Sequence, residues 1–325
     1  MSLVARIEAA DRRIRPHARE TPLLWSPALS DRAGTGIHLK LENLQHTGSF
    51  KLRGALNRML TLSDAERSRG IVTASTGNHG AACAYAGRMS GVAPLVFVPT
   101  GAAPSKVARI ERLGGQVRYH GVDSGETERE ARRQAELSGQ YFLSPYNDEE
   151  VMAGQGTVAA ELLRQLPDLG AVVVAVGGGG LIGGIATLLK QVRPDTLVIG
   201  CSPRNSAVMA ASVEAGRVLD LPCEPTLSDG TAGGVEADTV TFEPCRRYVD
   251  RYDLVREDEI RDAMRLVYES EGLIIEGAAG VAVASALRLA SDLGGRDVAV
   301  VVCGGNIGRA VWSEALETGS LPSPA

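Results

Sequence analysis

The chain has 325 residues and a net charge of −5, with 44% apolar and 22% charged residues, a balance that excludes a disordered protein. The acidic charge, without a basic run, and the 4% aromatic content argue against nucleic-acid and membrane-surface partners. Five scattered cysteines predict neither a disulfide framework nor a zinc site. The charged N-terminus is unlike a signal peptide or a membrane span, so a cytoplasmic protein is expected.

Short apolar runs alternate with helical stretches along most of the chain. After an opening helix, strands are expected at 37–41, 71–75, 95–98, 116–120, 141–143, 171–176, 197–199 and 298–302. Helices are expected near 79–90, 104–113, 125–138, 154–166, 181 onward, 257–271, 278–292 and 308 onward. This alternation predicts βαβ units and parallel sheets, with a domain join near 146–150. Residues 218–256 are expected to be irregular because they are rich in Gly, Pro and Asp.

Lysine is rare in this chain, since only four of the 34 basic residues are lysines. One of them, Lys51, ends the segment Thr-Gly-Ser-Phe-Lys (47–51), beside a helix predicted to start near Phe50. The positive end of a helix dipole favours the neutral amine, which is the form that Schiff-base chemistry requires. The alternative is an ordinary surface lysine.

A polar turn follows the predicted strand 71–75, with the sequence Ser-Thr-Gly-Asn-His-Gly (75–80). Free N–H groups at the start of a helix would bind an anion such as a carboxylate there. The alternative is a capping turn, with Thr76 or Asn78 as the N-cap. His79 has no partner identifiable by spacing, so it is equally well interpreted as a packed side chain.

Four glycines, Gly177–Gly180, follow the apolar run 171–176 and open a helix. Their backbone N–H groups can turn toward one phosphate, and the chain entropy that they cost makes a purely structural loop a weak explanation. The run also contains the dinucleotide pattern Gly178-x-Gly180-x-x-Gly183. The next strand ends without the carboxylate that NAD requires, whereas Ser202 and Arg204 leave NADP open.

The last motif is Cys303-Gly304-Gly305-Asn306, again at the end of an apolar strand. A residue at such a strand end can face a ligand in the crevice of an open sheet. The alternative for Cys303 is a small buried apolar side chain. Glu276, before a glycine, is predicted to start a helix.

In this order the motifs resemble the fold-type II family of pyridoxal-phosphate enzymes, and within it the serine/threonine dehydratases and serine racemases. The resemblance covers nearly the whole chain and is most specific over residues 42–55 (ENLQHTGSFKLRGA). It implies an α/β fold of two open parallel-sheet domains with helices on both faces. Residues 1–50 plus 148–325 would form the large cofactor-binding domain, and residues 51–147 the inserted small domain.

The resemblance also assigns roles to individual residues. Lys51 would be the catalytic residue, bound to the aldehyde of pyridoxal 5'-phosphate and later removing the Cα proton of the substrate. The cofactor contacts would come from Phe50, Lys51, Asn78, Gly177, Gly178, Gly179, Gly180, Leu181 and Cys303. The substrate carboxylate would be bound by Ser75, Thr76, Asn78 and His79.

The activity implied is a dehydratase, or ammonia-lyase, that converts L-threonine, L-serine or a close analogue to a 2-oxo acid and ammonia. The loop 229–236 is richer in glycine than in the usual dehydratases. It points to substrates such as 3-hydroxyaspartate, a phenylserine or a hydroxyectoine-derived compound, as in the hydroxyectoine-utilization dehydratase-like subgroup. Some relatives bind a divalent metal through a Glu where this chain has Ser202, so no metal is expected. A homodimer is common in the family.

Alternatives remain open on the sequence alone. Within the same cofactor chemistry they are a β-replacement synthase and a serine racemase, although the racemases place a serine where this chain has Thr76. An NADP-linked oxidoreductase rests on Gly178, Gly180 and Gly183. A catalytically idle amino-acid-binding protein is the third class, against which Lys51 and the complete glycine loop argue.

Overall fold

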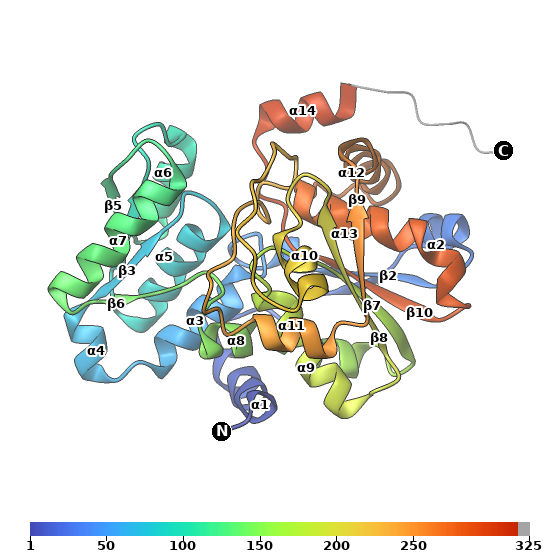
Figure 1. The fold of residues 1–325 in the computed structure, drawn as a ribbon, viewed down its shortest axis with the longest axis horizontal. Helices are drawn as coiled ribbons and strands as arrows, with labels where there is room; N and C mark the ends of the chain where they lie inside the picture. Colours follow the sequence, from blue (N-terminus) through green and yellow to red (C-terminus); the bar gives the residue numbers. More distant parts are fainter. Residues whose placement is uncertain (318–325) are drawn as a thin grey trace.

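The most apolar runs of the sequence form the central strands of the larger of two sheets (Figure 1). The computed structural model describes residues 1–317 of the chain. In the larger sheet, β7 (Leu169–Ala175) lies between β10 (Asp297–Val302) and β8 (Leu197–Pro203). Nearly every side chain of β7 and β10 is buried, as expected for parallel strands that helices cover on both faces.

Both sheets are built mainly from parallel strands. The larger has the order β1-β2-β10-β7-β8-β9, and only the edge strand β1 (Leu23–Trp25) runs antiparallel to its neighbour, β2 (Ile37–Leu41). The smaller has the order β5-β4-β3-β6, with its strands at Ile71–Ala74 (β3), Leu95–Val98 (β4), Gln116–Tyr119 (β5) and Tyr141–Phe142 (β6). The predicted fold class, α/β with two open and mostly parallel sheets, is confirmed.

Helices cover both sheets. Those around the smaller sheet are α3 (Lys51–Thr61), α4 (Asp64–Arg69), α5 (Asn78–Ser90), α6 (Pro104–Arg112) and α7 (Ser124–Ser138). Those around the larger sheet are α1 (Leu3–Ile14), α2 (Pro27–Ala33), α8 (Glu149–Gln165), α9 (Gly180–Val192), α10 (Val208–Ala215), α11 (Phe242–Tyr248), α12 (Glu257–Glu271), α13 (Gly277–Arg288) and α14 (Arg309–Glu317). Helix α3 packs against both α5 and α8, so it joins the two sets (Figure 1). Within residues 1–317, no helix combines the length and hydropathy needed to cross a bilayer.

The segment 218–256 is more ordered than its composition predicts. It contains α11 and the edge strand β9 (Arg251–Val255). Strand β9 has only five residues, and one of its two buried residues, Asp253, is charged while the other is Val255. The alternation of apolar and polar residues is therefore too short to indicate a strand. Strand β1 has only three residues, too few for the sequence pattern to indicate a strand.

Three of the sequence motifs follow the carboxyl ends of parallel strands. The turn 75–80 follows β3, the glycines 177–180 follow β7, and Cys303 follows β10. In open α/β sheets, ligands bind in the crevice beyond these strand ends. The topology therefore brings motifs from both sheets toward one place.

Candidate active site

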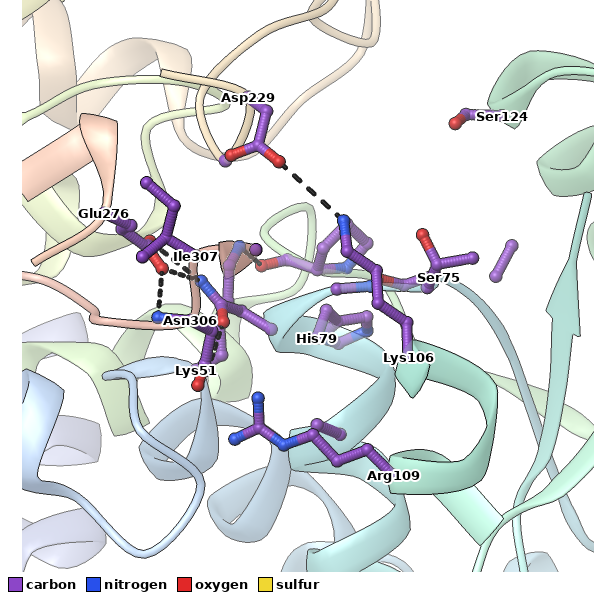
Figure 2. Close-up of a pocket in the computed structure, with 18 of the residues that line it drawn as sticks. Lys51, Ser75, His79, Lys106, Arg109, Ser124, Asp229, Glu276, Asn306 and Ile307 are labelled. Carbon is purple, nitrogen blue, oxygen red and sulfur yellow. Dashed lines mark hydrogen bonds and ion pairs between the residues drawn. The ribbon is translucent and has the colours of Figure 1, made fainter. Parts of the chain in front are cut away.

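A cavity of about 630 Å³ opens between the helices of the smaller sheet and the loops of the larger one (Figure 2). Its lining includes Lys51 and the turn 75–79 on one side, and Asp229, Glu276 and 305–308 on the other. A recess of about 40 Å³ adjoins it and reaches the glycine loop 177–180. All of the residues predicted to bind cofactor or substrate line one of these two spaces.

The backbone beside Lys51 is fixed to the end of β10. The N–H of Phe50 donates to the carbonyl of Cys303 at 3.0 Å, and Ser49 forms an isolated bridge with Gly304. Gly48 makes the preceding turn with φ of +66°, and a Cβ there would lie 2.5 Å from Oδ1 of Asn306. Only glycine combines this φ with such close contact. The segment therefore presents Lys51, the first residue of α3, at a defined position.

The amine of Lys51 lies in a setting that disfavours its charge. Its Nζ donates to the carbonyl of Pro145 at 3.0 Å and lies 5.1 Å from the centre of the Phe50 ring. Desolvation lowers the pKa of Lys51 to about 8, although the nearby Cys303, Cys83 and Glu276 act in the opposite direction. A substantial neutral fraction at physiological pH makes this amine a nucleophile and a base.

Glu276 is the acidic group at the centre of the site, and the sequence assigned it only to a helix start. It does precede α13, but its carboxylate accepts hydrogen bonds from Nδ2 of Asn78 at 2.9 and 3.0 Å and from the N–H of Asn306 at 3.1 Å. Burial is the main cause that raises the pKa of Glu276 to about 7. Asn306 also donates from Nδ2 to Oδ1 of Asn78, at 2.6 Å. These contacts join the turn after β3 to the turn after β10.

The turn after β3 leads into α5, whose first backbone N–H groups have no partners within the helix. Within it, the N–H of Gly77 donates to Oγ of Ser75 at 3.1 Å. Thr76 lines the cavity beside them. His79 is buried, with Nε2 3.0 Å from the carbonyl oxygen of Leu143, and desolvation lowers its pKa to about 3. It is therefore a neutral, packed side chain that also borders the cavity.

The glycine loop has no room for side chains. A Cβ on Gly178 would lie 2.5 Å from the ring of Tyr146, and one on Gly177 would lie 2.9 Å from the carbonyl oxygen of Thr231. Gly179 has φ of +82° and precedes α9, whose first N–H groups have no partners within the helix. This is an anion cradle at a helix N-terminus, of a kind that suits a phosphate group. Leu181 continues its wall.

Cys303 borders the recess at the end of β10. Burial raises the pKa of its thiol, so it is neutral at physiological pH. Lysine amine, phosphate cradle and neutral thiol together fit pyridoxal 5'-phosphate, which carries an aldehyde, a phosphate and a ring nitrogen.

The family model described as pyridoxal-phosphate dependent enzyme matches residues 14–304. The chain belongs to this family. An L-threonine ammonia-lyase of Thermotoga maritima is 42% identical over 301 residues, which span 93% of this chain and 75% of that protein. A serine racemase of Arabidopsis thaliana is 35% identical, spanning 93% of this chain and 92% of the relative. The structure of the processed form of threonine deaminase isoform 2 from Solanum lycopersicum matches with a TM-score of 0.93 at 34% identity, over 98% of this chain and 93% of that one.

These matches confirm the predicted family, its ammonia-lyase and serine racemase branch, and pyridoxal phosphate as the cofactor. The predicted enzyme class, a pyridoxal-phosphate-dependent ammonia-lyase, agrees with the names of the relatives. The NADP interpretation of Gly178, Gly180 and Gly183 finds no support among them. The roles of individual residues stay predictions.

Proposed function

We propose that this enzyme eliminates water from L-threonine, L-serine or a close β-hydroxy analogue and releases a 2-oxo acid and ammonia. The observation that carries the proposal is the amine of Lys51, with its pKa lowered to about 8, which borders both the cavity at the N-terminus of α5 and the recess at the N-terminus of α9. One helix N-terminus, at α5, suits the substrate carboxylate, and the other, at α9, suits the cofactor phosphate. The named ammonia-lyase relatives support this reaction.

When bound, pyridoxal phosphate supplies the electron sink that stabilises negative charge at Cα. Lys51 would hold the cofactor and then, as a free amine, accept the Cα proton. Gly177–Gly180 and Leu181 would bind the phosphate, while Phe50 packs beside the lysine. Cys303 would contact the ring nitrogen as a neutral group and leave the ring less electron-withdrawing than a carboxylate would.

Substrate positioning falls to the turn after β3 in this proposal. Ser75, Thr76, Asn78 and His79 would surround the substrate carboxylate, with backbone N–H groups as donors. We also propose the domain division 1–50 plus 148–325 and 51–147, with the cofactor in the cleft between the two parts. Fixing the reacting groups between them lowers the entropic part of the barrier.

Product analysis tests the reaction. The purified holoenzyme is incubated with L-threonine and with L-serine, and the oxo acid, ammonia and D-amino acid are quantified. We expect oxo acid and ammonia in equal amounts, and their loss in Lys51→Ala. Accumulation of D-serine without oxo acid would replace the proposal with a racemase, in which the hydroxyl group of Thr76 serves as the second base. A new β-substituted amino acid, formed when a thiol is added, would indicate a synthase.

The homodimer and the cytoplasmic location are also proposals, supported by the family resemblance and by the composition. The substrate's side chain is the least defined part of the proposed function. The glycine-rich loop 229–236 keeps 3-hydroxyaspartate, phenylserines and hydroxyectoine-derived compounds among the candidates.

A further inference from the structure

The charged side chains around the cavity are unequally satisfied. Glu128 is paired with Arg132 at 2.7 Å, and Asp229 lies 4.0 Å from Nζ of Lys106. Glu276 accepts the three hydrogen bonds described above. Lys51 is assigned to the cofactor. One charged group of this wall, Arg109, is left without a carboxylate within 4.0 Å among residues 1–317.

Arg109 lies on α6, three residues after Lys106, so the two cations share one face of the helix. Figure 2 shows both side chains extending from α6 into the cavity, with Asp229 across from Lys106. One terminal nitrogen of Arg109, Nη2, donates to the carbonyl of Thr47 at 2.7 Å. The guanidinium has five N–H donors in a fork that matches a carboxylate, and this bond uses one of them.

The guanidinium of Arg109 is also half-buried, which makes an unmatched charge costly. Desolvation, followed by the neighbouring charge of Arg112, lowers the pKa of Arg109, although the charge of Glu276 acts in the opposite direction. Two other half-buried arginines are paired with carboxylates, Arg58 with Asp148 and Arg132 with Glu236. The α-carboxylate of an amino acid already has a place at the start of α5, so the cation on α6 is available for a second anionic group.

We propose that Arg109 binds a second carboxylate, carried on the side chain of the substrate, and that the enzyme prefers β-hydroxy dicarboxylic amino acids over threonine and serine. Lys106 supports Arg109 by holding Asp229, the carboxylate across the cavity, in an ion pair. This inference rests on the proposed function and names its substrate class.

The test compares L-3-hydroxyaspartate, as both diastereomers, with L-threonine as substrates of the holoenzyme. We expect kcat/KM to be higher for one hydroxyaspartate diastereomer than for threonine. Arg109→Gln should lower kcat/KM for that diastereomer by about 10- to 100-fold, the usual range for a lost hydrogen bond to a charged group. Turnover of threonine should change by less than about 3-fold, and Arg109→Lys should restore part of the preference. Arg112→Gln, an exposed arginine on the same helix outside the cavity lining, is the matched control.

A binding measurement separates this inference from the proposed reaction. L-aspartate and L-asparagine have nearly the same shape and carry no β-hydroxyl group, and their dissociation constants follow from changes in the visible spectrum of the holoenzyme. The wild type should bind aspartate more tightly than asparagine, and Arg109→Gln should abolish the difference. Equal losses for hydroxyaspartate and threonine in Arg109→Gln would show that the residue only braces the Thr47 turn, and would overturn the inference. If no β-hydroxy amino acid were eliminated, the proposed function would fail, and the aspartate preference would still decide the inference.

Discussion

Lys51 shows how a single position acquires its chemistry from its surroundings. The residue is one of four lysines, and its pKa is lowered to about 8 mainly because the amine is withdrawn from water. Arginine could not serve here, since its guanidinium stays protonated. The lowered pKa, rather than the residue type alone, makes the position reactive near neutral pH.

Capture of the cofactor should therefore depend on pH through this amine. Only the neutral amine attacks an aldehyde, and its fraction rises about 10-fold per pH unit below the pKa and levels off above it. The second-order rate of pyridoxal phosphate incorporation into cofactor-free protein, followed by visible absorbance, should rise from pH 6 to about 8 and then flatten. A rate that stays constant over pH 6–9 would show that Lys51 is neutral throughout or is not the reacting group.

At the scale of elements, the surroundings of the loop between β7 and α9 leave no space for side chains on its glycines. The loop lies between the ring of Tyr146 on one side and the backbone of Thr231 on the other, and only a glycine backbone fits between them. A methyl group on Gly177 or Gly178 would collide with one of these two residues, so that residue or the loop would have to move.

Gly178→Ala should weaken cofactor binding. Its Cβ would lie 2.5 Å from the Tyr146 ring, so the ring or the loop must shift away from the phosphate position. We expect the dissociation constant of pyridoxal phosphate to rise by at least about 10-fold, equivalent to about 1.4 kcal/mol, as measured by equilibrium dialysis. Gly216→Ala, at an exposed helix end away from both cavities, is the control for a general glycine effect. Unchanged cofactor affinity in Gly178→Ala would mean that the phosphate binds elsewhere.

A second element-scale feature is the buried ionic cluster that holds α3 in place. Arg53, two residues after Lys51, donates to Glu42 at 2.8 Å and to Glu161 on α8 at 2.6 Å. Lys40 on β2 donates to the same Glu161. All four residues are at most 4% exposed. The cluster therefore fixes the helix that begins with Lys51 to both β2 and α8.

Arg53→Met should lower the free energy of unfolding by about 3–5 kcal/mol, because it leaves two buried carboxylates facing a single lysine. Urea unfolding of the holoenzyme, monitored by circular dichroism, measures this change. Arg133→Met removes an exposed helix pair with Glu130 and should have no measurable effect. Equal stability of the two variants would show that the buried carboxylates become protonated at little cost.

At the scale of the whole molecule, the active site opposes folding stability. Glu276 has its pKa raised to about 7 from an ordinary value of 4.5, so the folded chain binds its proton more tightly than the unfolded chain does. Relative to the ionised form, protonated Glu276 stabilises the fold; this contribution is complete below about pH 4.5 and is lost as pH rises toward 7. Above pH 7, ionised Glu276 costs the fold about 3 kcal/mol relative to a neutral side chain.

Glu276→Gln tests this cost in the cofactor-free protein. The melting temperature of the variant relative to the wild type should increase between pH 5 and pH 8, because only the wild type gains a buried charge. Differential scanning calorimetry at both pH values gives the comparison. Parallel pH profiles for the two proteins would show that the carboxylate is solvated or remains protonated.

Much of this molecule could be predicted from its sequence because the signals are local. The strands 71–74 and 298–302, the glycine loop and the lysine segment each appear within a few neighbouring residues. Glu276 and Arg109 could not be assigned in this way. Glu276 depends on Asn78, which lies 198 positions away, and Arg109 depends on the carbonyl of Thr47, which lies 62 positions away. Periodicity identified their helices but carries no information on which distant groups those helices face.

The order of strands in the larger sheet has a consequence for how the protein is made. Strand β10 lies between β2 and β7, although it is the last strand to leave the ribosome. Strands β3 to β6 can pair as soon as residue 142 has emerged, whereas β2 and β7 each wait with one open edge for residues 297–302. Cys303 and the bridge from Gly304 to Ser49 arrive at the same moment. Nascent chains should therefore acquire the cofactor only near the end of synthesis, with the smaller sheet already formed.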